Sequence, residues 1–94
     1  MDKLVVLFTM KGCPHCDELK KKLVSENLEY YERDIFEHSD EYELFVEITK
    51  NEYVPAFMII EDDNTDKPIT KLFAPDRDFQ SLDEGVEIIK KEML

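Results

Sequence analysis

Two cysteines with two residues between them lie where a buried strand gives way to a helix, and this arrangement limits the possible folds more than any other feature. Residues 4–9 are apolar up to a polar last residue and include the β-branched pair Val5 and Val6, a pattern typical of a fully buried strand. Gly12 interrupts this strand, and Pro14 suits the first turn of a helix, where its missing N–H would have no partner anyway. The sequence therefore predicts a β–α unit with the cysteines at its turn.

The rest of the chain continues the alternation of strands and helices. The first helix should reach about Glu26, and the further elements are expected as a strand over 28–35, a helix from Ser39 or Asp40 to about Lys50, strands over 56–60 and 69–73, and a helix from Asp78. Turn-forming residues at 61–66 should join the last two strands into a hairpin. A β–α–β start requires a parallel, right-handed crossover. We therefore expect one α/β domain over residues 1–94, in the order β-α-β-α-β-β-α, with a four-stranded mixed sheet flanked by helices on both faces.

Apolar residues at helical spacing indicate which side of each helix faces the core. The last helix has the clearest stripe, formed by Phe79, Leu82, Val86, Ile89 and Met93. The expected inward residues are Leu19, Leu23 and Val24 in the first helix, and Leu44, Phe45 and Ile48 in the second. We interpret Tyr30, Tyr31 and Tyr42 as packing residues as well.

Composition excludes several classes of partner. The net charge of −11 argues against nucleic acid, because phosphate binding needs clustered Lys and Arg, and the only basic run, at 20–22, is expected on a solvated helix surface. No apolar run is long enough to cross a bilayer, and the five apolar residues after Lys3 are too few for a secretory signal. With only two cysteines, a secreted disulfide scaffold is also disfavoured. These features favour a cytoplasmic protein. No long exposed apolar edge forces a dimer, so we expect a monomer.

The cysteine pair has the features of a redox centre. At a helix N-cap, the sulfur of Cys13 would lie among unpaired N–H groups at the positive end of the helix dipole, which favours the thiolate. Lys11 and a protonated His15 would add positive charge, and Pro14 would stiffen the turn. Cys16 follows about one helical turn later, within reach of Cys13. This predicts that Cys13 attacks a substrate disulfide and that the more buried Cys16 resolves the mixed disulfide.

Two metal-based alternatives stay open beside this interpretation. Cys13, His15 and Cys16 are all possible zinc ligands, but a closed structural site needs four, and His38 would have to fold close to them. A metal or iron–sulfur cluster shared between two chains through Cys13 is the other alternative. We expect no bound metal.

The order of elements, the motif Cys13-Pro14-His15-Cys16 after the first strand, and Val54-Pro55 before the third strand together resemble the glutaredoxins. The resemblance implies a thioredoxin-like fold and a glutathione-dependent reductase that has no bound cofactor and uses glutathione as its reductant. The usual family motif is Cys-Pro-Tyr-Cys, so His15 is a change within it. Periplasmic disulfide oxidases share the histidine, but they are larger and exported.

The resemblance also implies a glutathione site. Lys11 matches the basic residue that holds the glycine carboxylate, Val54 the residue whose backbone pairs with the cysteinyl unit, and Pro55 the cis-proline. Tyr53 stands where the family commonly has Thr.

The match weakens at residues 74–78, where the family has two glycines whose backbone N–H groups bind the γ-glutamyl carboxylate. Here Ala74-Pro75 replaces the glycines, and Arg77 either supplies a compensating charge or is solvated. Asp78 is expected to cap the last helix, and it counts with Arg77 among the candidate glutathione-binding residues.

The sequence thus favours a dithiol oxidoreductase that reduces protein disulfides or glutathione mixed disulfides. A redoxin of the same fold, recharged by a thioredoxin-type flavin reductase, is the second hypothesis. A cluster-bridging dimer is the third.

Overall fold

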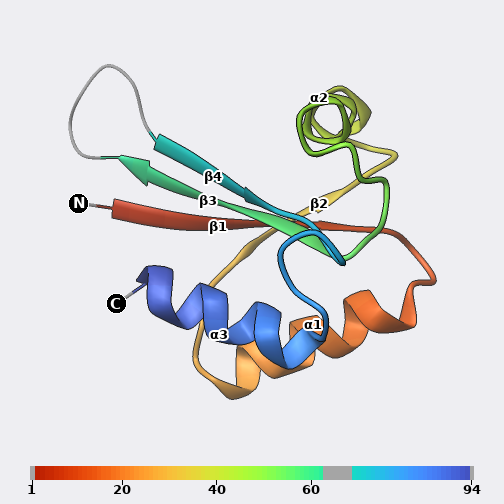
Figure 1. Cartoon of the computed structure of the whole chain (residues 1–94). Helices are drawn as coiled ribbons and strands as arrows, with labels where there is room; N and C mark the ends of the chain where they lie inside the picture. The colour runs from red at the N-terminus through yellow and green to blue at the C-terminus, as the bar shows by residue number, and fades with distance from the viewer. Residues whose placement is uncertain (1, 63–68, 94) are drawn as a thin grey trace.

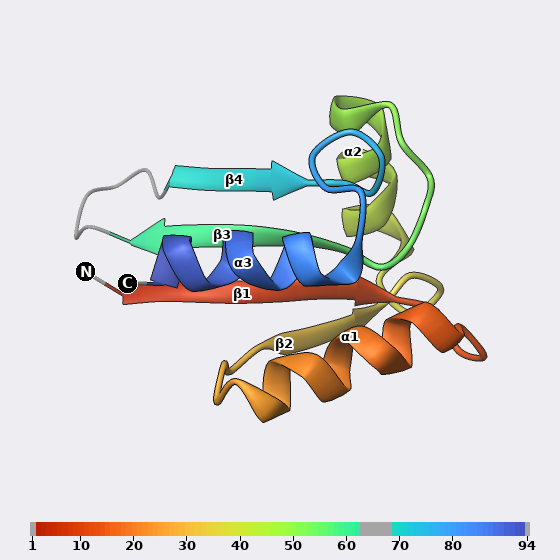
Figure 2. The same cartoon turned by 60° about the horizontal axis from the view of Figure 1, so that its bottom comes forward.

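The computed structural model of the chain describes residues 2–62 and 69–93. Its elements are β1 (Asp2–Thr9), α1 (Pro14–Ser25), β2 (Tyr31–Asp34), α2 (Ser39–Thr49), β3 (Ala56–Asp62), β4 (Ile69–Phe73) and α3 (Leu82–Met93). The four strands form one sheet in the order β2-β1-β3-β4, in which β1 and β2 are parallel and the other neighbours antiparallel. Helices α1 and α3 cover one face of the sheet and α2 the other (Figures 1 and 2). This confirms the predicted order, the mixed sheet and the thioredoxin-like fold.

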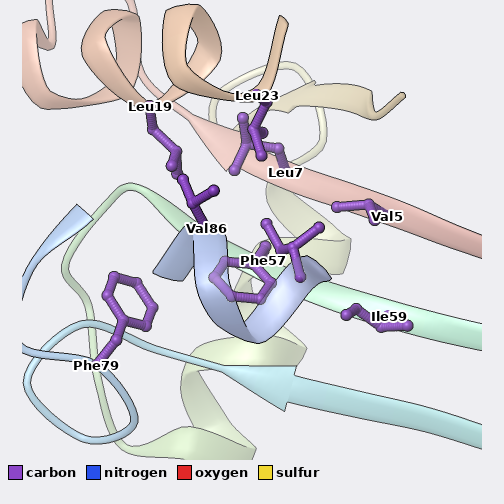
Figure 3. Close-up of a cluster of buried hydrophobic side chains, with 9 residues drawn as sticks. Val5, Leu7, Leu19, Leu23, Phe57, Ile59, Phe79 and Val86 are labelled. Carbon is purple, nitrogen blue, oxygen red and sulfur yellow. The ribbon is translucent and has the colours of Figure 1, made fainter. Parts of the chain in front are cut away.

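Alternate side chains of β1 enter two separate cores, as the period of two in a strand requires. Val5 and Leu7 face α1 and α3, where they meet Leu23 and Phe57 in the larger core (Figure 3). Phe8 faces the opposite way and belongs to the smaller core beneath α2. The strand that ends at the cysteine loop is therefore held from both faces.

Gly85 has a packing role in α3. A Cβ atom built at this position would lie 3.5 Å from Phe79 Cδ2 and 3.6 Å from Phe57 Cε1. The helix backbone thus lies directly on the aromatic side chains, which explains how the helical stripe continues through a glycine.

The second helix exposes part of its predicted inward face. Phe45 and Thr49 are buried, whereas Leu44 and Ile48 are each 58% exposed. The small core beneath α2 accommodates only one narrow stripe of helix residues. Leu44 and Ile48 each lie one position before a buried residue, so the helix turns their side chains away from this core. The burial of Leu44 and Ile48 was therefore predicted wrongly. The same holds for Val24 and Tyr31, which are 66% and 53% exposed.

Several boundaries also differ from the prediction. The second strand begins at Tyr31 rather than at residue 28, because the N–H of Leu28 donates to Leu23 O at 2.9 Å and so belongs to the end of α1. The third strand extends to Asp62, two residues further than expected, and positions 63–66 of the predicted turn lie outside the described residues.

Neither predicted cap of the later helices is correct. Ser39 and Asp40 lie inside the first turn of α2, whose cap position is His38, without a side-chain capping bond. Helix α3 begins at Leu82 rather than at Asp78, and the hydroxyl of Ser81 accepts the N–H of Glu84 at 3.2 Å. Of the helices within 2–62 and 69–93, none combines the length and apolar character that a bilayer crossing requires.

Candidate functional site

The loop after β1 places Cys13 at the N-cap of α1. Gly12 has a φ of 78°, a backbone conformation that other residues rarely adopt, and the N–H of Cys13 donates to Met10 O at 3.2 Å. Cys13 itself is extended, Pro14 occupies the first turn, and the sulfur of Cys13 accepts the N–H of Cys16 at 3.1 Å. The predicted cap position of the first cysteine is confirmed.

The two cysteines form a disulfide across the first turn of α1, with their Cα atoms 5.3 Å apart. They differ in accessibility: Cys13 is 7% exposed and Cys16 is fully enclosed. An attacking thiol must approach one sulfur in line with the bond to the other, so an incoming group reaches Cys13 more readily than Cys16.

A cavity of about 370 Å³ begins beside the dithiol at His15. Its opposite wall consists of Val54 and Pro55, which are joined by a cis peptide bond, and of a segment that leads from β4 into α3. From that segment Pro75, Asp76 and residues 79–82 line the cavity. The structure thus brings together three of the predicted site residues, His15, Val54 and Pro55. Lys11, Arg77 and Asp78 are not among the lining residues.

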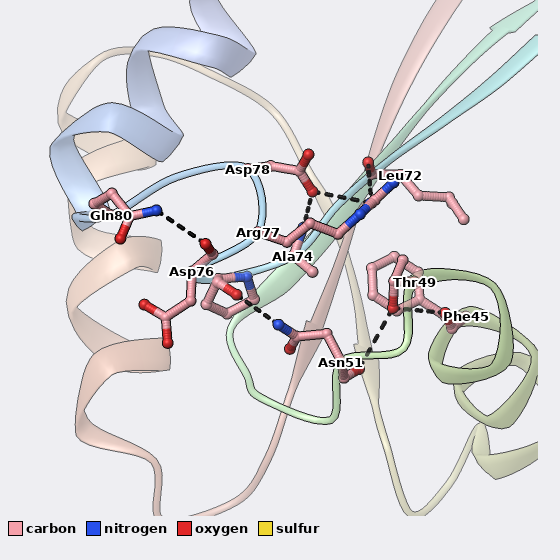
Figure 4. Close-up of polar contacts among 10 residues, drawn as sticks. Phe45, Thr49, Asn51, Leu72, Ala74, Asp76, Arg77, Asp78 and Gln80 are labelled. Atoms are coloured by element: carbon pink, nitrogen blue, oxygen red, sulfur yellow. Dashed lines mark hydrogen bonds and ion pairs between the residues drawn. The ribbon is translucent and has the colours of Figure 1, made fainter.

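The segment 74–78 is folded by its own hydrogen bonds (Figure 4). The N–H of Asp76 donates to Phe79 O and that of Asp78 to Ala74 O, both at 2.9 Å. The N–H of Ala74 donates to the Asp78 carboxylate at 2.8 Å, and Pro75 has no N–H. The Asp78 carboxylate also pairs with Arg77 Nη1 at 3.1 Å. Asp78 therefore stabilises this turn instead of capping α3.

The side chain of Asn51 links the segment before Val54 to the segment after β4, and sequence reasoning missed this contact. Its Nδ2 donates to Pro75 O at 2.6 Å, and its Oδ1 accepts the N–H of Tyr53 at 2.9 Å. The preceding Lys50 is left-handed, with a φ of 59°. A left-handed residue after a helix is a common helix ending, although it is usually glycine, and no local pattern indicated that the next side chain would bridge to residue 75.

A polar cluster holds the other end of the dithiol loop and was also missed. The hydroxyl of Thr9 donates to Glu32 Oε2 at 2.6 Å, and Lys20 Nζ donates to the same oxygen at 2.9 Å. These two bonds lower the pKa of Glu32, the Thr9 bond most strongly, and the Glu32 carboxylate in turn raises the pKa of Lys20. Because β2 pairs in parallel with β1, Glu32 lies opposite Leu7, two residues before the end of β1. The cluster therefore links the middle of α1 to β2 and to the last residue of β1.

The described ranges contain no cluster of potential metal ligands. Within 2–62 and 69–93 no three His, Cys, Asp or Glu side chains are arranged to hold a metal ion. His38, named above as a conceivable fourth zinc ligand, lies at the start of α2, 4.0 Å from the carboxylate of Glu41.

A thioredoxin-like sheet that places a Cys-x-x-Cys disulfide at the N-terminus of its first helix defines a thiol–disulfide oxidoreductase. Comparison with known families gives the narrower assignment: the glutaredoxin family model matches residues 5–63. The chain belongs to the glutaredoxin family. A comparison with individual curated proteins found no similar sequence.

Proposed function

We propose that the protein is a dithiol glutaredoxin that reduces protein disulfides and glutathione mixed disulfides, with Cys13 as nucleophile and Cys16 as resolving thiol. The observation that supports it best is the unequal setting of the two sulfurs. Cys13 is partly accessible at the helix N-cap and accepts an N–H bond, whereas Cys16 is enclosed and reaches only Cys13.

In the proposed reaction, the Cys13 thiolate attacks one sulfur of the substrate disulfide, and the other sulfur leaves as a thiolate. Cys16 loses its proton to solvent and attacks Cys13, which releases the second substrate thiol and leaves the protein disulfide. Two molecules of glutathione then reduce that disulfide and become glutathione disulfide. Pro14 and His15 belong to the same turn, where Pro14 restricts the backbone and His15 supplies a cation when protonated.

The backbone of Val54 is the proposed docking point for the substrate. In the described part of the chain no hydrogen bond uses its N–H or its C=O, and the adjacent Pro55 is buried and lines the cavity. Both groups are thus free to pair with an extended thiol substrate. Lys11 is exposed in the dithiol loop, where it would attract a substrate carboxylate.

One observation favours a second candidate, a redoxin recharged by a thioredoxin-type flavin reductase. The N–H groups of Ala74, Asp76 and Asp78 are used within their own turn, and Arg77 is paired with Asp78. These groups are therefore not available to bind the γ-glutamyl carboxylate of glutathione. If glutathione binds weakly for this reason, a different reductant would recycle the protein.

The test is turnover of a small glutathione mixed disulfide, with glutathione and glutathione reductase as the recycling system, for the wild type, Cys13→Ser and Cys16→Ser. We expect Cys13→Ser to be inactive and Cys16→Ser to accumulate a mixed disulfide with protein substrates, visible by mass. No other cysteine is present to substitute for either.

Loss of activity in Cys16→Ser alone would contradict the assigned roles. If the wild type fails with glutathione but turns over with a thioredoxin-type reductase, the second candidate is correct. Failure with both reductants and with dithiothreitol would overturn the proposed function.

A further inference from the structure

The cavity beside the dithiol has an unusual charge for a site that is expected to receive a carboxylate-rich tripeptide. Its ionisable lining residues are His15, Tyr53 and Asp76. Asp76 is thus its one acidic side chain, and neither Arg77 nor Lys11 lines it. Figure 4 shows the Asp76 side chain directed away from the Arg77–Asp78 pair. Among the described residues no ion pair involves Asp76, because the adjacent guanidinium is bound to Asp78 at 3.1 Å.

The position of the Asp76 backbone is fixed from both sides. Its N–H donates to Phe79 O at 2.9 Å, and its C=O accepts Gln80 Nε2 at 3.0 Å. Its φ is 66°, in the left-handed region that Asp and Asn tolerate better than most residues. The carboxylate is therefore held at the rim of the cavity by a closed turn rather than by a mobile loop.

Several backbone groups that would favour an anion at the same place are already occupied. The N–H groups of 74, 76 and 78 are hydrogen-bonded within the turn, as described above. The N-terminus of α3 also borders the cavity, but Asp83 and Glu84 lie in its first turn and complement the positive end of the helix dipole. Among the ionisable side chains that line the cavity, Asp76 is the one that acts on a ligand with a negative charge.

We propose that this site selects disulfides that carry a cationic group close to the sulfur, such as amine-bearing disulfides, over those that carry carboxylates, and that Asp76 is the residue that determines this specificity. The proposal rests on the dithiol chemistry proposed above, not on glutathione as the reductant, and narrows the class of disulfide that is reduced. When Cys13 attacks the near sulfur, the cation of that half contacts Asp76, and the far half leaves as its thiolate. The net charge of −11 attracts the same substrates at longer range.

The experiment compares three disulfides of similar size: cystamine, which is cationic, bis(2-hydroxyethyl) disulfide, which is neutral, and 3,3′-dithiodipropionate, which is anionic. The reduced protein, freed of reductant, is mixed with an excess of each, quenched with acid, alkylated, and followed by mass as the protein disulfide forms. The variants are Asp76→Asn and Glu29→Gln. Asn suits the left-handed backbone, so the turn is retained. Glu29 is exposed in the loop after α1, at the other end of that helix from the dithiol, and its substitution removes the same unit of charge.

Each rate constant is compared with that of the wild type for the same disulfide, so the intrinsic reactivities of the three reagents cancel. We expect Asp76→Asn to slow cystamine about threefold and to accelerate the anionic disulfide by a similar factor, in line with the strength of an exposed ion pair. Glu29→Gln should change the rate constant for the cationic or the anionic disulfide by no more than about 1.5-fold. Glu29 lies more than a Debye length from the cavity, so its charge is screened there.

The inference would be overturned if the two variants changed these rate constants equally, or if Asp76→Asn did not change them. Either result would leave the dithiol chemistry intact. If none of the three reagents oxidises the wild-type protein, the proposed function fails and the inference fails with it.

Discussion

The two glycines of this chain should respond to the same substitution with opposite signs. At Gly85 the added Cβ would lie 3.5 Å from Phe79 and 3.6 Å from Phe57, which are ordinary van der Waals distances. A Gly→Ala change in a helix interior contributes about 1 kcal/mol through backbone propensity alone. We therefore expect Gly85→Ala to raise the free energy of unfolding by about 1 kcal/mol, and the melting temperature by roughly 4–8 °C.

At Gly12 no heavy atom lies within 4 Å of the added Cβ, so there is no clash. The backbone φ of 78°, however, lies in the region where a Cβ is close to its own carbonyl, at a cost of about 1–2 kcal/mol. Gly12→Ala should therefore lower the free energy of unfolding by about 1 kcal/mol. Both changes restrict the unfolded chain equally, so that contribution cancels between them and a difference of about 2 kcal/mol remains.

The assay is urea unfolding of the oxidised proteins, with the denaturant slopes compared to exclude a change in the compactness of the unfolded state. If Gly85→Ala destabilises the protein, α3 packs more tightly on the two aromatic side chains than the structure indicates. If both substitutions change the free energy of unfolding in the same direction and by the same amount, the unfolded-state contribution dominates. That result would refute the reasoning from local geometry.

Three further predictions concern Glu32, Ser81 and Leu44. The bond from Thr9 and the charge of Lys20 depress the pKa of Glu32, so they stabilise the fold above the ordinary carboxyl range, and this contribution is lost as the pH falls through the depressed pKa. Glu32→Gln should accordingly weaken the decline of the urea midpoint between about pH 6 and 3, and an unchanged decline would contradict this. Ser81→Ala should cost about 1 kcal/mol through loss of the α3 cap, as measured by the same unfolding assay, and a cost near zero would mean that the cap is dispensable. Leu44→Gln should change stability by less than about 0.5 kcal/mol because the side chain is 58% exposed, and a larger loss would indicate that this surface is covered.

The sequence predicted the sheet and the dithiol because both depend on local signals. The apolar run before Cys13, the proline after it and the helical stripe of α3 each reflect contacts or backbone preferences within a few residues. The cis peptide before Pro55 likewise agrees with the position of this proline before a buried strand.

The missed features depend on which elements meet in space. Leu44 and Phe45 are both apolar, and only the small area of the core beneath α2 decides which of them is buried. Asp78 has the composition of a helix cap, but the turn at 74–78 requires its carboxylate for the N–H of Ala74. The bridge from Asn51 to Pro75 spans separate parts of the chain and has no local signal.

The position of β1 within the sheet has a consequence for how the site opens. This strand lies between β2 and β3, so its amides should exchange with solvent only in rare, large-scale openings, and it delivers the dithiol loop. The facing wall at 74–82 follows β4, an edge strand with a neighbour on one side only, and should exchange sooner. A bulky polypeptide disulfide would thus be admitted by movement of the 74–82 wall as a unit, with its internal hydrogen bonds intact, while the reacting sulfurs stay at a fixed position.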